Sequence, residues 1–299
     1  MEKPQYYCPI ITCFDRDRNI DEAAQRSVYE HVMAGGIKGF IVMGSIGEFF
    51  SLSMAQKKQM VDIAADVCRG RAKIFIGCGS TRIDDTVELA NYALERGADS
   101  AIIVPPYYFA LTPPELERWY DLCAERIGGP VFLYNYPGAT GSDITPDVLV
   151  KLLRKHRNIA GLKDTVPGYP HTRSLIEAVR PEFPDFCVLQ GFDDNFFHNM
   201  LSGGNGAISG LTNLYPEIFT AAVAAVEAHD FDACERLQKK INKLFTLYGI
   251  MDPFHPLMKR AMMLRGLPIQ PYCSEPMPVP TEEAVAAVKA LMAEVDAMN

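Results

Sequence analysis

The stretch Ile159-Ala160-Gly161-Leu162-Lys163-Asp164-Thr165 places a single lysine directly after four mostly apolar residues. A short apolar run of this kind is typical of a buried strand, which here would end in a charged side chain. A lysine in that position is costly unless it is neutralised, paired or used in chemistry. Burial favours the uncharged amine, which is a nucleophile toward carbonyl carbons. The stretch therefore indicates either a reactive lysine or, as the plainer alternative, a strand-end lysine whose ammonium group reaches solvent.

Seven further apolar runs alternate with helical patterns on both sides of this stretch. We expect them to form strands over residues 9–14, 39–43, 73–78, 100–104, 131–134, 187–190 and 206–209. Continuous apolar runs are typical of parallel strands that are buried on both faces. Parallel strands joined by helices form either an open doubly wound sheet or a closed barrel. Eight strand–helix units without a long break favour an α/β fold of the (β/α)8 TIM-barrel type.

The pattern also predicts how the chain is divided. Residues 1–230 contain all eight strand–helix units and are expected to form the barrel domain. Residues 231–299 contain three more helical patterns, at about 232–248, 255–265 and 281–295. We expect these residues to form a C-terminal helical extension.

The composition excludes several classes of protein. Among 299 residues, 48% are hydrophobic and 22% are charged, as in ordinary globular proteins. A net charge of −8 argues against a nucleic-acid or acidic-membrane partner. The first residues lack a signal-peptide pattern and no apolar run approaches the ~20 residues that span a membrane, so we expect a cytoplasmic protein. Eight cysteines without a Cys-x-x-Cys pair indicate buried thiols rather than a disulfide framework or zinc site.

In a barrel of this type the active site lies at the carboxyl ends of the strands. This rule selects candidate residues directly from the predicted strands. Lys163 is the only lysine that we place at such an end. The candidates are Ser45, Ile46, Glu48, Tyr107, Tyr108, Tyr134, Asn135, Tyr136, Lys163, Thr165, Asp193, Asp194 and Ser209.

Several of these candidates have a chemical interpretation and a plainer one. Tyr134, on a strand adjacent to that of Lys163, could donate and accept protons, or its ring could simply pack. The turn Gly44-Ser45-Ile46-Gly47-Glu48 resembles an anion-binding turn, although no Walker loop is present. Asp193 and Asp194 could bind sugar hydroxyls or a metal, or cap a helix. The six histidines do not gather at strand ends, so no metal site is indicated.

Three motifs together make the chain resemble a known family. They are Gly44-Ser45-Ile46-Gly47-Glu48, Tyr134-Asn135-Tyr136-Pro137-Gly138-Ala139-Thr140-Gly141, and Gly161-Leu162-Lys163-Asp164-Thr165. In this order and spacing they resemble the pyruvate-dependent class I aldolases, and the similarity covers essentially the whole chain. This family includes dihydrodipicolinate synthase, N-acetylneuraminate lyase and the 2-keto-3-deoxy-sugar-acid aldolases.

The resemblance implies a role for individual residues. Lys163 would form a Schiff base with a 2-keto acid, and Tyr134 would carry the proton. Ser45 and the neighbouring turn amides would bind the carboxylate of pyruvate. Ile46 replaces a second hydroxyl residue of the family and suggests a more apolar wall. Ile208 matches a position whose backbone carbonyl faces the site, and neither a cofactor nor a metal would be required.

The resemblance also implies an assembly and leaves several activities open. Tyr108 matches a tyrosine that reaches into a neighbouring subunit's site, so we expect a homotetramer. An aldolase that cleaves or forms a carbon–carbon bond is the leading interpretation. A sugar-acid dehydratase, N-acetylneuraminate lyase and a dihydrodipicolinate synthase-like enzyme remain alternatives on the same scaffold. A fourth alternative is a binding protein without activity.

Departures from the family pattern indicate the substrate. Synthases that use aspartate semialdehyde typically have an arginine where this chain has Ala139. A serine of the sialic acid lyases corresponds to Gly210 here. The motifs therefore look most like 2-keto-3-deoxy-gluconate aldolase, in which the residues that contact the sugar hydroxyls match Tyr136, Thr165 and Asp193.

Overall fold

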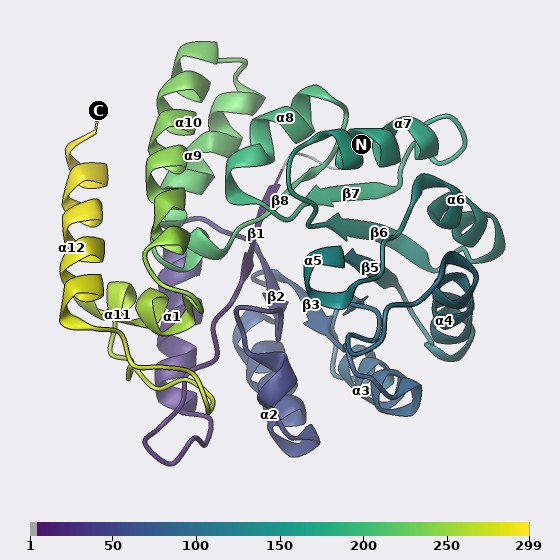
Figure 1. Ribbon diagram of the computed structural model, residues 1–299, viewed down its shortest axis with the longest axis horizontal. Coiled ribbons are helices and arrows are strands. Elements are labelled where there is room, and N and C mark those ends of the chain that lie inside the picture. The colour runs from purple at the N-terminus through teal and green to yellow at the C-terminus, as the bar shows by residue number, and fades with distance from the viewer. Residues whose placement is uncertain (1–4, 299) are drawn as a thin grey trace. The chain divides into compact units, whose positions relative to one another are not determined.

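The computed structural model describes residues 5–298 and contains eight parallel strands that close a barrel in sequence order, from β1 to β8 (Figure 1). Helices follow the strands along the chain, and three helices occupy the C-terminal part. The predicted α/β barrel with C-terminal helices is therefore confirmed. By their contacts the residues group into two compact units, Lys73–Ile208 with Gln5, and Tyr6–Ala72 with 209–298.

The first unit contains six consecutive strands. Its strands are β3 (Lys73–Gly77), β4 (Ser100–Ile103), β5 (Val131–Asn135), β6 (Ile159–Asp164), β7 (Cys187–Gln190) and β8 (Gly206–Ile208). Its helices are α3 (Ile83–Glu95), α4 (Pro113–Arg126), α5 (Pro137–Thr140), α6 (Pro146–Lys155), α7 (Pro170–Val179) and α8 (Phe196–Leu201), with the 3₁₀ turn η2 (Asp193–Asn195). Helices α4 and α6 pack beside each other, as Figure 1 shows.

Local sequence signals explain where these helices begin. Thr112 and Glu115 form a capping box at the start of α4, and proline occupies the first turn. Thr145 caps α6 by accepting a hydrogen bond from the Val148 amide. These caps begin the helices directly after the segments that follow β4 and β5, and so help to define the loops at the carboxyl ends of those strands.

The pairing of β5 with β6 has a functional consequence. In this parallel pair Tyr134 lies opposite Lys163, and Asn135 lies opposite Asp164. Because successive side chains of a strand point to opposite faces, Tyr134 and Lys163 share one face. Asn135 and Asp164 share the other face, on the side of α7.

The second unit combines the N-terminal and C-terminal parts of the chain. Its strands are β1 (Gln5–Pro9, of which Gln5 groups with the first unit) and β2 (Gly39–Val42). Its helices are α1 (Glu22–Ala34), α2 (Met54–Cys68), α9 (Pro216–Glu227), α10 (Phe231–Phe245), α11 (His255–Leu264) and α12 (Glu282–Ala297). Its 3₁₀ turns are η1 (Phe49–Ser51), η3 (Gly210–Asn213) and η4 (Thr246–Gly249). Helix α12 packs against α10 and α11 (Figure 1).

The first strand differs from the prediction. The apolar run predicts this strand at residues 9–14, whereas β1 covers Gln5–Pro9. Side chains from other parts of the unit bond the backbone of the following residues. The Asn213 carboxamide accepts from the Ile11 amide at 3.1 Å, and the Gln25 side chain accepts from the Cys13 amide at 2.8 Å. Ile11 and Cys13 are therefore buried although they belong to no strand ladder. Side chains, rather than a neighbouring strand, accept the hydrogen bonds of their amide groups.

Two further expectations concern the cysteines and the membrane. All eight cysteines are free thiols, and seven of them are buried, as predicted. Within residues 5–298, none of the helices has both the length and the apolar character needed to cross a bilayer.

Candidate active site

Lys163 and Tyr134 lie together at the carboxyl ends of two adjacent strands. Both side chains are buried, each with 6% of its surface exposed. The Lys163 Nζ lies 4.2 Å from the centroid of the Tyr134 ring. The pairing of β5 with β6 brings them together, as the strand-end rule predicted. A buried amine next to a phenol can act as a nucleophile with a nearby proton carrier.

Two more of the predicted residues, Tyr136 and Thr165, directly follow strands of the first unit. The Tyr136 ring stacks on Tyr134 with a centroid distance of 6.0 Å. The Thr165 hydroxyl is buried and has no hydrogen-bond partner within residues 5–298. Gly191 leaves the space for this side chain, since a Cβ there would lie 2.0 Å from the Thr165 Oγ1. A buried hydroxyl without a protein partner is suited to bind a ligand oxygen.

Two of the predicted residues on β8 and after β7 are also buried, whereas Asp194 is half-buried. Asp193 is 3% exposed and Ile208, the last residue of β8, is 1% exposed. The alternative that Asp193 and Asp194 serve as helix caps is wrong. The residue before α8 is Asn195, and the residue before the 3₁₀ turn η2 is Phe192. Burial raises the pKa of Asp194 above its usual value.

A buried polar network lies on the opposite face of the strand pair. The Asp164 carboxylate, which is fully buried, accepts hydrogen bonds from Asn135 Nδ2 at 2.9 Å and Thr172 Oγ1 at 2.6 Å. His171 Nδ1 lies 3.0 Å from the same carboxylate. Asn135 Nδ2 also donates to Asp143 Oδ1 at 2.9 Å. Because Asn135 and Asp164 directly follow Tyr134 and Lys163, these bonds help to hold the two candidate side chains in register.

His171 is enclosed by two carboxylates. Its Nδ1 faces Asp164, and its Nε2 lies 3.2 Å from Asp143 Oδ1. Burial alone would lower the pKa of His171, but the neighbouring Asp143 and Asp164 carboxylates outweigh burial and raise the pKa to about 10. The neighbouring His171 ring in turn lowers the pKa of Asp143. At neutral pH the ring is therefore an imidazolium between the buried Asp164 carboxylate and the half-buried Asp143 carboxylate.

The pKa of His171 makes the stability of the fold depend on pH. The folded-state pKa of about 10 exceeds the reference pKa of 6.5, so the stabilisation is complete below pH 6.5. It should decline as the pH rises from 6.5 to about 10. We expect a loss on the order of 2 kcal/mol, because solvent partly screens the half-buried ring.

Chemical denaturation at several pH values checks this expectation. His171→Asn should flatten the decline of the unfolding free energy between pH 7 and pH 10. His229→Asn is a matched control, because His229 lies in the second unit, and it should keep the wild-type slope. An unchanged slope in His171→Asn would show that the imidazolium does not carry the effect.

The turn Gly44–Glu48 belongs to the second unit and follows β2. Its backbone closes through the Gly47 amide, which donates to the Gly44 carbonyl at 3.0 Å, and the Glu48 amide, which donates to the Ser45 carbonyl at 3.0 Å. Ser45 is half-buried, and Ile46 is 5% exposed. A compact turn of this kind can present the amides that are not used within it to an anion. Ser45 and Ile46 thus occupy the turn that the motif predicted.

The backbone of this turn is strained at both ends. Met43 and Glu48 have φ angles of 59° and 57°, in the left-handed region that residues with a Cβ rarely adopt. Each such residue costs roughly 1–2 kcal/mol. A Cβ at Gly47 would lie 2.9 Å from the Ile10 carbonyl oxygen, so this position requires glycine. Strain of this size persists only where the surroundings hold the backbone in place.

Residues far along the chain provide those surroundings. The Glu48 carboxylate is fully buried, and its Oε1 accepts from Lys259 Nζ of α11 at 2.6 Å. Its Oε2 accepts from the Ser274 amide at 2.6 Å. His255 Nε2, also on α11, lies 3.2 Å from the Ser45 carbonyl oxygen. The turn is therefore bonded to the C-terminal helices at two of its residues.

Tyr108 does not lie with the buried candidates. Its side chain is 83% exposed and contacts Phe109, which is 76% exposed, with a ring-centroid distance of 4.8 Å. Two adjacent exposed aromatic rings are unusual on the surface of a monomer and are typical of a contact with another subunit.

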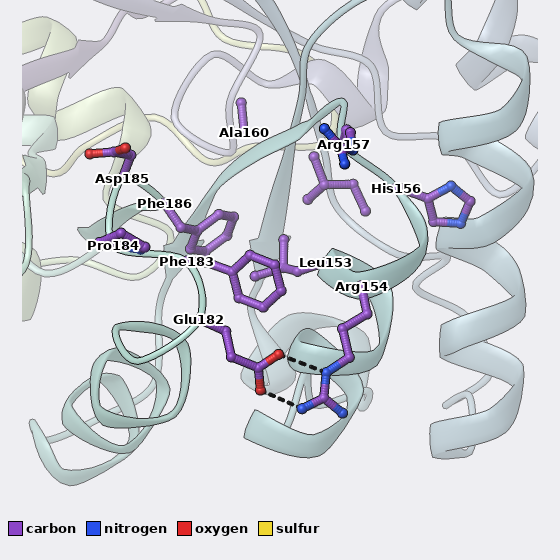
Figure 2. Close-up of a pocket in the computed structure, with 11 residues that line it drawn as sticks. Leu153, Arg154, His156, Arg157, Ala160, Glu182, Phe183, Pro184, Asp185 and Phe186 are labelled. Atoms are coloured by element: carbon purple, nitrogen blue, oxygen red, sulfur yellow. Dashed lines mark hydrogen bonds and ion pairs between the residues drawn. The ribbon is translucent and has the colours of Figure 1, made fainter.

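One surface pocket lies away from these residues. It has a volume of about 670 Å³ and is lined by Leu153, Ile159, Phe183 and Phe186, among others (Figure 2). Ile159 begins β6 and Phe186 precedes β7, so the pocket lies at the amino ends of these strands. Arg154 at its rim is paired with Glu182, as Figure 2 shows. Since barrels carry their chemistry at the opposite ends, this pocket is not the candidate active site.

The strand-end rule does not select four residues that the structure places against the candidates: His171, Asp143, His255 and Lys259. None of them lies at the end of a predicted strand. Each of them bonds either a candidate residue or the residue that directly follows a candidate. For His171 and Asp143 the available signal was the polar pair Asn135 and Asp164, which directly follow Tyr134 and Lys163 and require buried partners.

Comparison with known proteins places the chain in a family. Residues 5–295 match the model of the dihydrodipicolinate synthetase family. The chain is 35% identical over 284 residues to the probable 2-dehydro-3-deoxy-D-pentonate aldolase YjhH of Escherichia coli K12, covering 95% of this chain and 94% of that protein. It is 31% identical over 284 residues to the putative 2-dehydro-3-deoxy-D-gluconate aldolase YagE of the same organism, covering 95% and 94% respectively.

A solved structure supports the same relationship. The crystal structure of YagE from Escherichia coli K12 in complex with pyruvate matches with a TM-score of 0.95 and 30% identity, over 99% of both chains. The resemblance drawn from the three motifs is thereby confirmed. The chain belongs to the dihydrodipicolinate synthetase family and is a lyase of the class I, Schiff-base aldolase type.

Proposed function

We propose that this enzyme cleaves 2-keto-3-deoxy sugar acids into pyruvate and an aldehyde, and catalyses the reverse condensation. Lys163 is the amine that forms the imine, and Tyr134 is the proton carrier. The turn Gly44–Glu48 binds the carboxylate of the keto acid. The observation that carries the proposal is the buried pair of Lys163 and Tyr134, with Nζ 4.2 Å from the ring centroid.

The proposed steps use only these groups. The Lys163 amine attacks the ketone carbon C2 of the keto acid, and water leaves as the imine forms. Tyr134 accepts the proton of the C4 hydroxyl while the C3–C4 bond breaks, and the aldehyde departs. The bonding electrons move into the protonated imine and give an enamine. Protonation at C3 and hydrolysis then release pyruvate and the free amine.

Borohydride trapping tests the imine directly. Borohydride added with pyruvate should reduce the imine and leave an adduct of about 72 Da on Lys163, found by peptide mass spectrometry. Product analysis separates the alternatives. An aldolase yields pyruvate and an aldehyde, whereas a dehydratase yields one intact dehydrated keto acid. Absence of an adduct at saturating pyruvate would contradict the proposal.

The residues near the proposed site favour a polyhydroxylated substrate. Ala139 on α5 carries no charge where synthases using aspartate semialdehyde typically have an arginine to bind a second carboxylate. Tyr136, Thr165 and Asp193 offer polar groups for the sugar hydroxyls. Two relatives, YjhH and YagE, are named as 2-dehydro-3-deoxy sugar acid aldolases, which supports this substrate class.

Gly210 disfavours the sialic acid alternative. A Cβ at this position would lie 2.5 Å from the Tyr248 Oη and 3.2 Å from the Ile46 Cδ1. The serine that sialic acid lyases have at the matching position therefore has no room here unless Tyr248 moves.

Substrate competition provides the corresponding prediction. We expect kcat/KM for a 2-keto-3-deoxy hexonate to exceed that for sialic acid by at least about 100-fold, since buried polar groups reject a substrate that leaves them unpaired. In the condensation direction, glyceraldehyde should be preferred to aspartate semialdehyde. Coupled detection of pyruvate measures cleavage, and loss of pyruvate measures condensation. A higher kcat/KM for aspartate semialdehyde would refute the interpretation of Ala139.

We also infer that the enzyme acts in the cytoplasm as a homotetramer in which Tyr108 reaches a neighbouring subunit's site. The exposed Tyr108–Phe109 pair supports this inference. Tyr108→Phe should lower kcat by about tenfold and leave the assembly intact, because it removes one hydroxyl and keeps the ring area. Sedimentation and turnover measure the two effects. A fully active monomer would contradict the assembly.

A further inference from the structure

We propose that helix α11 of the C-terminal extension holds the Gly44–Glu48 turn in its strained shape, and that His255 and Lys259 thereby set the affinity for the keto acid's carboxylate. Both are positioning residues, since they bond the turn. The inference rests on the proposed function of the turn and adds a role for the C-terminal helices, which the (β/α)8 barrel itself does not require.

Lys259 fixes one end of the turn. Its ammonium group is fully buried, donates to the Glu48 carboxylate at 2.6 Å and also donates to the Tyr272 carbonyl at 2.7 Å. The Ser274 amide occupies the second oxygen of the same carboxylate. Glu48 is the residue whose left-handed backbone ends the turn. Its side chain is thus held by two charge-assisted bonds that a rotated backbone would break.

His255 fixes the other end. Its Nε2 lies 3.2 Å from the carbonyl oxygen of Ser45. Burial lowers the pKa of His255, although the neighbouring Glu48 carboxylate opposes this effect, so the ring is neutral at pH 7. A carbonyl oxygen only accepts hydrogen bonds, and Nε2 must therefore carry the proton and donate. This bond orients the peptide group between Ser45 and Ile46, whose amide belongs to the anion-binding turn.

The two contacts come from one face of a single helix. Residues four apart on a helix lie above one another, so His255 and Lys259 point in the same direction. They reach Ser45 and Glu48, the second and last residues of the turn. A movement of α11 would therefore displace both residues of the turn together.

A purely structural role of the ion pair is the competing explanation, and the choice of ketone separates the two. Pyruvate and acetone both form an imine with a lysine, but acetone has no carboxylate for the turn to bind. A loosened turn should weaken the reaction with pyruvate alone. General damage to the fold should weaken both reactions.

The experiment measures borohydride trapping as a function of ketone concentration in three variants. Glu48→Gln combined with Lys259→Met avoids leaving one buried charge unpaired. His255→Leu removes the bond to Ser45, and His255→Gln keeps a donor there. Lys289→Met, at an exposed lysine of α12, is the matched control.

We expect the pyruvate concentration for half-maximal trapping to rise by at least about tenfold, equivalent to about 1.4 kcal/mol, in the double variant and in His255→Leu. His255→Gln should restore most of the wild-type value, and trapping with acetone should stay unchanged throughout. Folded variants with wild-type half-saturation for pyruvate, or with equal losses for both ketones, would overturn the inference. Failure of the wild type to trap pyruvate would instead refute the proposed function.

Discussion

Lys163→Arg is expected to lower kcat/KM by at least about 10⁴-fold, because removal of a covalent nucleophile eliminates the catalysed pathway. Arginine keeps the positive charge and much of the length of lysine, but its guanidinium group does not form an imine with a ketone. The buried position of Lys163 at the end of β6 limits replacement by another amine. The adduct formed by borohydride and pyruvate should disappear from the intact protein.

A matched control distinguishes this result from a general effect of removing a lysine. Lys73 begins β3 in the same unit, at the amino end of its strand. Lys73→Arg should keep wild-type kcat/KM and full trapping at Lys163. Lys163→Arg could instead keep more than a few per cent of the wild-type cleavage rate, with no adduct found elsewhere in the protein by mass spectrometry. This result would exclude the imine mechanism.

Tyr134→Phe is expected to reduce kcat by about 10²- to 10³-fold, which is the usual contribution of a positioned acid–base group. The ring remains, so its contacts with Lys163 and Tyr136 are preserved. Formation of the imine with pyruvate should persist at saturating concentration, although more slowly. Stopped-flow assays of cleavage, combined with borohydride trapping, would separate the loss of proton transfer from a loss of binding.

Tyr29→Phe is the corresponding control for a buried phenol. The Tyr29 side chain is fully buried on α1, in the unit that does not contain Tyr134. Turnover should remain within about twofold of wild type. Equal losses of kcat in both variants would show that Tyr134 acts through the fold rather than through its proton.

The sequence was sufficient for the parts of the site that follow from strand order. The apolar runs predicted eight strands, and the rule for their carboxyl ends then selected Lys163 and Tyr134. Their pairing in register follows from the barrel, because consecutive parallel strands lie beside each other. Helix boundaries were close where capping residues are local: the helical pattern at about 281–295 corresponds to α12, which Thr281 caps.

What could not be predicted depends on contacts between distant residues. The first strand was placed too late because the amides of Ile11 and Cys13 bond to side chains elsewhere, one of them Asn213. His171 carries no pattern of its own, and only the folded chain shows that two carboxylates enclose it. Lys259 is separated from Glu48 by 211 positions, so no local rule connects them.

The same separation has a consequence for synthesis of the protein. Glu48 leaves the ribosome 211 residues before Lys259, an interval of roughly 10–40 s at usual rates of translation. Residues Lys73–Ile208 are translated within that interval. Throughout it, the Glu48 carboxylate still lacks the Lys259 ammonium group as its partner. A nascent chain that stops before α11 therefore cannot form the buried Glu48–Lys259 pair, and the contacts that hold the Gly44–Glu48 turn are completed only near the end of translation.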